Sequence, residues 1–128
     1  MNMQPVISVV IPAHNEEAYL PSCLEAVKRA AAAFEASRRA GKRTDALPGD
    51  GGGVEIVVVA NRCTDRTVEI AERFGAGVVQ NDARSIAQVR NAGVRASHGG
   101  IVVTVDADSV MSENALHEVA EMLSCGKF

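Results

Sequence analysis

The chain has 128 residues, a length typical of one domain, with 47% hydrophobic and 23% charged residues. This composition indicates a folded domain with a buried core and argues against a disordered chain. The net charge of −3 and the 3% share of aromatic residues argue against a nucleic-acid surface, which needs basic or stacking side chains.

Four short runs of mostly β-branched residues predict strands at Val6–Ile11, Val54–Val59, Gly77–Gln80 and Ile101–Val105. Most of the runs are continuous and do not alternate with polar residues. Such runs are typical of strands that are covered on both faces of a sheet.

Amphipathic segments predict helices between and after these strands, at Glu17–Arg39, at Asp65–Phe74, at Ser85–Ser97 and after Ser112. We expect Thr64 or Asp65 to cap the second helix, Gly75 to close it and Ser112 to cap the last one. Alternating strands and helices predict a three-layer α/β/α fold with a mainly parallel sheet, in a single domain that spans residues 1–128.

Features of targeting and redox chemistry are few. Cys23, Cys63 and Cys125 form no CxxC pair, which predicts reduced thiols and no disulfide or structural zinc.

The N-terminal apolar run is too short for a signal peptide and has no basic region before it. No stretch approaches the ~20 apolar residues that span a bilayer. We therefore expect a cytoplasmic protein without a transmembrane segment.

Polar clusters follow three of the predicted strands: PAHNEE at Pro12–Glu17, ANRCTD at Ala60–Asp65 and DADS at Asp106–Ser109. Each cluster alone is compatible with ordinary turn chemistry. Ligands bind beyond the carboxyl ends of the strands in open parallel sheets. The three clusters together therefore predict one binding crevice at that edge.

Asp106 and Asp108, separated only by Ala107 at a strand end, place two carboxylates a few ångströms apart. Like charges this close are unfavourable unless a cation or hydrogen-bond donors satisfy them. Mg²⁺ or Mn²⁺ suits such a pair, because hard divalent ions take one or two carboxylates together with the oxygens of a substrate diphosphate. The alternative is that Asp106 ends the strand and Asp108 only caps the turn.

Three blocks of the chain, ISVVIPAHNEE, VEIVVVANRCTDRTVEIA and RSIAQVRNAGVRASHGGIVVTVDADS, together resemble the N-terminal half of an inverting family 2 glycosyltransferase with the GT-A fold. They span Ile7 to Ser109. The resemblance implies a metal-dependent transfer of a sugar from a UDP- or GDP-sugar to an unknown acceptor. The metal and arginines would neutralise the leaving nucleoside diphosphate.

The resemblance also implies site residues by position. It places the nucleotide sugar against Pro12, Ala13, His14, Glu16, Asn61, Arg84, Arg90 and Asp106, and the metal on Asp108 and Asp106. Asn61 stands where the family usually has an aspartate that hydrogen-bonds the base. Because an amide also donates, the preferred base can differ from uracil. We expect Cys63 to be a packed thiol and Asp65 a helix cap.

Only about twenty residues follow Asp108, and they form one predicted helix. The family's second half, which binds the acceptor and supplies the general base, is not among them. Glu113, Glu118 and Glu121 are expected on a solvated face, so the catalytic residues stay unknown. We therefore expect a donor-binding half, with exposed apolar surface that favours a homodimer or a partner that supplies the other half.

Two other functions are compatible with parts of the sequence. A non-catalytic nucleotide-binding or interaction module would use the same fold without turnover. A haloacid-dehalogenase-type phosphatase would use Asp106 as a nucleophile, but it needs a downstream lysine and acidic pair, and only Lys127 follows. A dinucleotide-binding fold is disfavoured, because no G-x-G-x-x-G motif follows the first predicted strand. The glycine-rich loop Gly41–Gly53 is disfavoured as a phosphate-binding loop, because no helix directly follows it.

Overall fold

The computed structural model describes residues 5–39 and 53–124, so most of the loop Gly41–Gly53, together with Cys125 and Lys127, lies outside the described residues. The elements in chain order are β1 (Ile7–Ala13), α1 (Leu20–Arg39), β2 (Val54–Asn61), α2 (Thr67–Arg73), β3 (Gly77–Asn81), α3 (Ile86–Ala96), β4 (Ile101–Thr104) and α4 (Ala115–Ser124). This order confirms the predicted alternation of strands and helices. No helix of the described ranges has both the length and the apolar character to cross a membrane.

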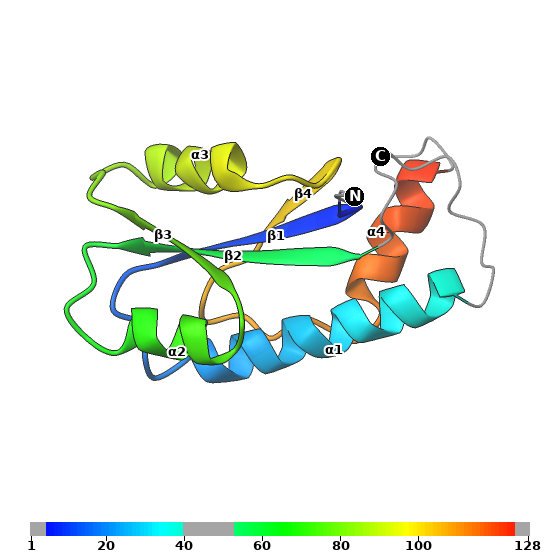
Figure 1. Cartoon of the computed structure of the whole chain (residues 1–128), viewed down its shortest axis with the longest axis horizontal. Helices are drawn as coiled ribbons and strands as arrows, with labels where there is room; N and C mark the ends of the chain where they lie inside the picture. The colour runs from blue at the N-terminus through cyan, green and yellow to red at the C-terminus, as the bar shows by residue number, and fades with distance from the viewer. Residues whose placement is uncertain (1–4, 40–52, 125–128) are drawn as a thin grey trace.

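The four strands form one sheet in the order β3-β2-β1-β4, and every neighbouring pair is parallel. Figure 1 shows α3 on one face of the sheet and α1 with α2 on the other, while α4 lies beside α1. The predicted three-layer α/β/α fold is therefore confirmed.

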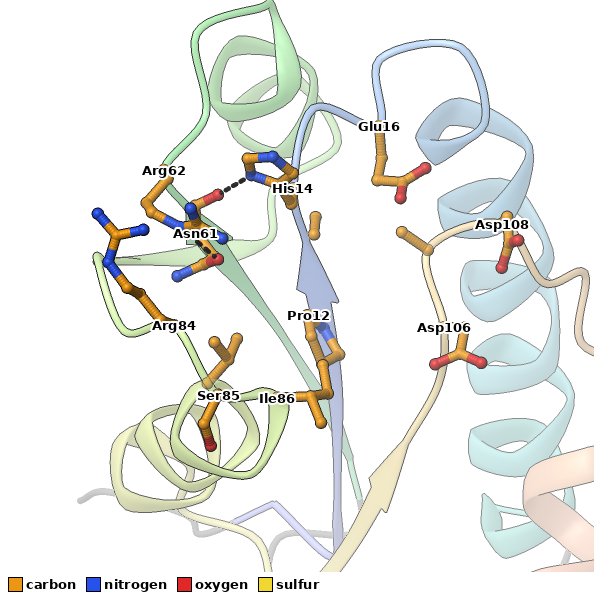
Figure 2. A pocket seen from close by; sticks show the side chains of 13 residues that line it. Pro12, His14, Glu16, Asn61, Arg62, Arg84, Ser85, Ile86, Asp106 and Asp108 are labelled. Atoms are coloured by element: carbon orange, nitrogen blue, oxygen red, sulfur yellow. Dashed lines mark hydrogen bonds between the residues drawn. The ribbon is translucent and has the colours of Figure 1, made fainter.

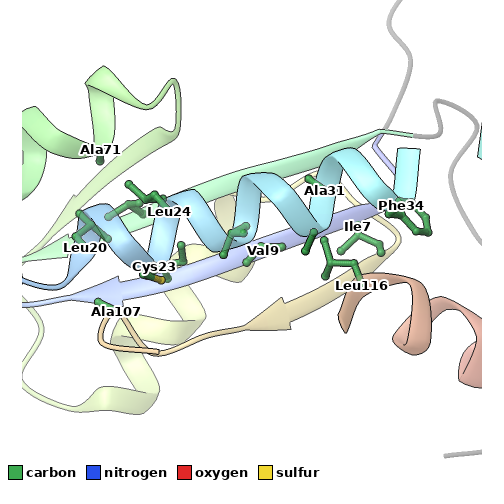
Figure 3. Packing of buried hydrophobic residues seen from close by; sticks show 14 of the residues in the cluster. Ile7, Val9, Leu20, Cys23, Leu24, Ala31, Phe34, Ala71, Ala107 and Leu116 are labelled. Atoms are coloured by element: carbon green, nitrogen blue, oxygen red, sulfur yellow. The ribbon is translucent and has the colours of Figure 1, made fainter. Parts of the chain in front are cut away.

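Strand β1 lies in the middle of the sheet and is buried on both faces. Ile7, Val9 and Ile11 pack into the core formed with α1, α2 and α4, as Figure 3 shows for Ile7 and Val9. Val10 points the other way, into the smaller cluster beneath α3. A strand with two buried faces needs a nearly continuous apolar run, because successive side chains point to opposite faces.

Two of the expected helix caps differ in detail. The N-cap position of α2 is Arg66, one residue after Asp65, although the Asp65 carboxylate accepts a hydrogen bond from the Thr67 N–H. The cap predicted at Ser112 is wrong, because the chain first makes a turn and α4 begins at Ala115. Gly75 ends α2 as predicted, with φ at +80°.

Helix α3 lies close to the sheet at Gly93. A Cβ atom at this position would lie 2.3 Å from Val10 Cγ1 and 2.8 Å from Val59 Cγ2, distances that real Cβ contacts do not reach. The glycine therefore lets the backbone of α3 rest directly on β1 and β2.

We predict that Gly93→Ala lowers the free energy of unfolding by about 1–3 kcal/mol, because the added methyl forces α3 away from the two valines. Urea titration of both proteins measures the change. Gly77→Ala is the matched control, since its Cβ would meet only Ile56 O at 3.7 Å. Equal losses in the two variants would contradict the close packing of α3.

A polar cluster joins the sheet to the connection between α3 and β4. Ser8 of β1 is fully buried. Its hydroxyl donates to Glu55 Oε1 at 2.6 Å and accepts from the Gly99 N–H at 2.8 Å. The His98 N–H donates to Glu55 Oε1 at 2.7 Å, and His98 Nδ1 lies 2.8 Å from Glu55 Oε2. Glu55 therefore satisfies Ser8 and holds the start of β4 in place.

Burial of Glu55 opposes its charge, but the hydrogen bonds from Ser8 and His98 outweigh that effect and hold its pKa below the usual glutamate value. A carboxylate with a lowered folded-state pKa stabilises the fold when it is ionised, and this stabilisation is lost as pH falls. We predict that the melting temperature falls between roughly pH 5 and pH 3, and that Glu55→Gln reduces this fall. Glu72→Gln, on the exposed surface of α2, should leave the wild-type profile unchanged. Identical profiles for the wild type and Glu55→Gln would contradict the role of Glu55.

Candidate functional site

A pocket of about 410 Å³ lies at the carboxyl ends of β1, β2 and β4, beside the start of α3. The structure brings most of the predicted site residues into its wall: Pro12, Ala13, His14, Glu16, Asn61, Arg84, Asp106 and Asp108. The sequence analysis missed other lining residues: Arg62, Ser85, Ile86, Val89 and Ala107. Most of these directly follow or precede a predicted residue, so their proximity in the chain was the available signal.

The charged side chains of the pocket divide into two groups. Figure 2 shows His14 on the strand in the middle, with Arg62 and Arg84 on one side and Asp106 and Asp108 on the other. The basic groups follow β2 and β3, whereas the acidic groups follow β4. A ligand that spans the pocket would therefore meet cationic groups at one end and carboxylates at the other.

The acidic end is built on a turn that directly follows β4. The Ser109 N–H donates to Asp106 O at 2.9 Å and closes the turn. Ala107 is buried in the core, while Asp106 and Asp108 on either side are exposed. The small apolar residue thus anchors the turn and leaves both carboxylates free to face solvent or a ligand.

Cys23 of α1 lies beneath this turn, and its thiol donates to Asp106 O at 3.6 Å. Burial, followed by the charges of Asp108 and Asp106, raises the pKa of Cys23 to about 11. The thiol is therefore protonated at neutral pH and acts as a packing group.

Arg90 does not line the pocket but reaches its acidic end from α3. Its Nη2 lies 3.8 Å from Asp106 Oδ1, with 45% of the arginine and 69% of the aspartate side chain exposed. An exposed pair at this distance contributes little to stability. The contact can therefore be exchanged for another ligand of Asp106 at small cost.

Asn15 connects the loop after β1 to the loop after β2. It has a left-handed backbone, with φ at 51°. Its Oδ1 accepts hydrogen bonds from the N–H of Thr64 at 2.7 Å and of Asp65 at 3.3 Å. These bonds fix the relative position of two of the three loops that form the pocket.

Asp65 and Thr67 complete this connection. The Asp65 carboxylate accepts from the N–H groups of Thr67 and Glu17, and Thr67 Oγ1 accepts from the Glu16 N–H at 2.9 Å. Burial works against the charge of Asp65, but hydrogen bonds from the Thr67 hydroxyl and from the N–H groups of Thr67 and Glu17 keep its pKa below the usual aspartate value. Asp65 therefore holds the loop that carries Glu16, a role that differs from the helix cap predicted for it.

Two further contacts hold β1 to the end of β2. His14 Nδ1 lies 2.7 Å from Asn61 O. Because a carbonyl only accepts, Nδ1 carries a proton, and Nε2 of a neutral ring is an acceptor. Cys63 donates to Ala13 O at 3.4 Å, which agrees with the packed thiol predicted for this position.

The Asn61 side chain is only 5% exposed and is fully engaged within the protein. Its Nδ2 donates to Ala83 O at 2.8 Å and to Asn81 O at 3.1 Å. Its Oδ1 accepts from Arg62 Nε at 3.3 Å (Figure 2). Asn61 therefore joins β2 to the connection that leads from β3 into α3, a structural role that the sequence did not predict.

The sequence profile of glycosyl transferase family 2 matches residues 8–126. The chain belongs to this family. Among curated relatives, the low-salt glycan biosynthesis hexosyltransferase Agl6 of Haloferax volcanii is 30% identical over 98% of this chain and 26% of its own length. The undecaprenyl-phosphate 4-deoxy-4-formamido-L-arabinose transferase of Pseudomonas paraeruginosa is 37% identical over 80% of this chain and 28% of its own length. The family 2 domain described here thus spans about a quarter of the length of these relatives.

Solved structures share the fold of this family 2 domain. Glucosyl-3-phosphoglycerate synthase of Mycobacterium tuberculosis superposes with a TM-score of 0.70 at 24% identity, over 95% of this chain and 41% of that chain. TarS of S. aureus in complex with UDP-GlcNAc gives a TM-score of 0.69 at 22% identity, over 92% of this chain and 31% of that chain. Membership in the family argues against the phosphatase and dinucleotide-binding alternatives.

We predict that Asn61→Asp destabilises this family 2 domain by about 1–3 kcal/mol, although aspartate is the residue that the resemblance leads one to expect there. A carboxylate cannot donate to Asn81 O and Ala83 O, so both acceptors lose a partner and face a negative charge. Asn91→Asp, on the exposed surface of α3, is the control for the added charge. Chemical denaturation that shows equal stability for the two variants would contradict the structural role of Asn61.

Proposed function

We propose that the pocket binds a nucleoside diphosphate sugar together with Mg²⁺ or Mn²⁺, and that the sugar passes from this donor to an acceptor held elsewhere. The observation that carries the proposal is the convergence of three strand-end loops on one pocket, with exposed carboxylates at one end and arginines at the other. Family membership and the hexosyltransferase among the relatives support the same class of reaction.

The donor set of Asp106 and Asp108 fits a hard divalent ion. Both carboxylates are exposed on one turn. In the described part of the chain, no group of three or more His, Cys, Asp or Glu side chains could hold a metal alone. Mg²⁺ and Mn²⁺ need no such cage, because substrate phosphates and water complete their coordination. A structural neighbour was solved with Mn²⁺ and UDP, which supports this assignment.

In this proposal Asp108 is the principal metal ligand and Asp106 lies near the ribose. The bound ion would supply positive charge that stabilises the departing nucleoside diphosphate. Arg90, already beside Asp106, stays within reach of an anion bound there. Arg84 is exposed just before the start of α3, where its guanidinium can contact the diphosphate.

The nucleoside would lie against the middle of the pocket. Pro12 and Ala13 form its floor on β1, and the His14 ring is held there by its hydrogen bond to Asn61 O. Glu16, whose backbone is fixed by Thr67, lines the same pocket and offers a carboxylate to a hydroxyl group. In this proposal, residues outside the pocket bind the acceptor and supply the general base. They belong to another part of the polypeptide or to a partner subunit.

We predict that Asp108→Ala weakens nucleotide binding at least about tenfold in the presence of Mn²⁺, and has little effect when Mn²⁺ is absent. Isothermal titration calorimetry with UDP and GDP measures both conditions. Glu113→Ala is the control, because this exposed acid lies outside the residues that line the pocket. Unchanged affinity of Asp108→Ala with Mn²⁺ present would show that the metal assignment is wrong.

Turnover separates a transferase from a module that only binds nucleotides. The wild-type chain is incubated with UDP- and GDP-sugars and Mn²⁺, and release of the free nucleoside diphosphate is followed. Release that requires Asp108 supports a catalytic donor site. Metal-dependent nucleotide binding without release of the nucleoside diphosphate would show that the chain binds the donor but does not turn it over.

A further inference from the structure

We propose that Arg62 reads the base of the nucleotide and selects guanine over uracil. This inference rests on the proposed function and adds to it the identity of the donor. Arg62 lines the pocket, was not among the residues predicted from the sequence, and projects from the end of β2.

Arg62 is held in an unusual backbone conformation. Its φ of 50° lies in the left-handed region, which is unfavourable for residues that carry a Cβ atom. Glycine would adopt this conformation without strain. A strained arginine in a pocket is a reason to look for a function of its side chain.

Both the backbone and the side chain of Arg62 are anchored. Its N–H donates to Asn81 O at 3.1 Å, and its Nε donates to Asn61 Oδ1 at 3.3 Å. Asn61 is itself fixed by its bonds to Asn81 and Ala83. The guanidinium is therefore held at Nε, and its other N–H groups have no hydrogen-bond partner in the part of the chain that the structure describes.

The position of Arg62 in the pocket assigns it to the nucleoside end. Asp106 and Asp108 lie on the opposite side, as Figure 2 shows. If Arg84 and a cation on those carboxylates hold the diphosphate between them, the base extends toward Arg62. Arg62 then faces the base and not the phosphates.

The side chains at this end favour a base with two acceptors on one edge. The Asn61 oxygen accepts from Arg62, and Asn61 is too deeply buried to offer its second lone pair readily to a base. Guanine presents O6 and N7 side by side, and the guanidinium fork pairs with both. Uracil instead presents an imide N–H between its carbonyl groups and needs an acceptor. His14 Nε2 is an acceptor in the neutral ring, so uracil bound through His14 is the competing outcome.

The test compares GDP and UDP binding by calorimetry in the presence of Mn²⁺. We expect the wild type to bind GDP about tenfold more tightly than UDP, or more. Arg62→Ala and Arg62→Gly should both lose this preference through weaker GDP binding, and Arg62→Lys should not restore it, because a lysine cannot pair with two acceptors at once. Arg62→Gly suits the left-handed backbone and therefore keeps the domain folded.

Arg73→Ala is the matched control, since this exposed arginine of α2 lies outside the residues that line the pocket. Three outcomes overturn the inference. UDP binding as tight as or tighter than GDP binding removes the guanine preference but leaves the donor site intact. Equal losses of GDP affinity in Arg73→Ala and Arg62→Ala would show that Arg62 contributes only its positive charge. Absence of metal-dependent binding for both nucleotides overturns the proposed function as well.

Discussion

The burial of β1 on both faces is the constraint on which the rest of the structure depends. Because β2 and β4 pair with it in parallel, Ala60 lies opposite Ala13 and Thr104 lies opposite Val10. The three strands therefore end at one edge of the sheet, and the polar residues after each of them face one another. The core between the helix layers thus determines which loops can share a ligand.

The strands and the acidic turn could be predicted from the sequence, because both follow from local patterns. Continuous β-branched runs predict buried strands without knowledge of which segments pack against them. The turn at Asp106–Asp108 is held by the burial of Ala107, a residue within the turn itself. The hydrogen bonds of the Asn61 amide within the protein could not be predicted, because its partners Asn81 and Ala83 lie twenty and more residues away along the chain. The Ser112 cap was wrong because residues 113–114 form a turn, closed by the Ala115 N–H on Ser112 O at 3.1 Å, before α4 begins.

The two ends of the pocket are held by different means. The acidic end belongs to a turn that is anchored by the buried Ala107, so its carboxylates are not needed for packing, and Asp106 makes only an exposed pair with Arg90. The basic end belongs to a network of hydrogen bonds among β2, β3 and the start of α3, in which Asn61 is the central residue. Substitutions at the basic end therefore alter stability and ligand contacts together, whereas those at the acidic end act mainly on the ligand.

Backbone strain is also concentrated at this site. In the described ranges, Asn15 and Arg62 are the non-glycine residues with positive φ, and both lie in loops at the carboxyl edge of the sheet. Asparagine tolerates this conformation, and the hydrogen bonds of Asn15 to the neighbouring loop explain its presence. Arginine has no such tolerance, and its bond to Asn61 could be made by other donors. A glycine would avoid the strained backbone but would lack the N–H groups of the Arg62 guanidinium. We therefore connect the backbone strain of Arg62 with recognition of the base.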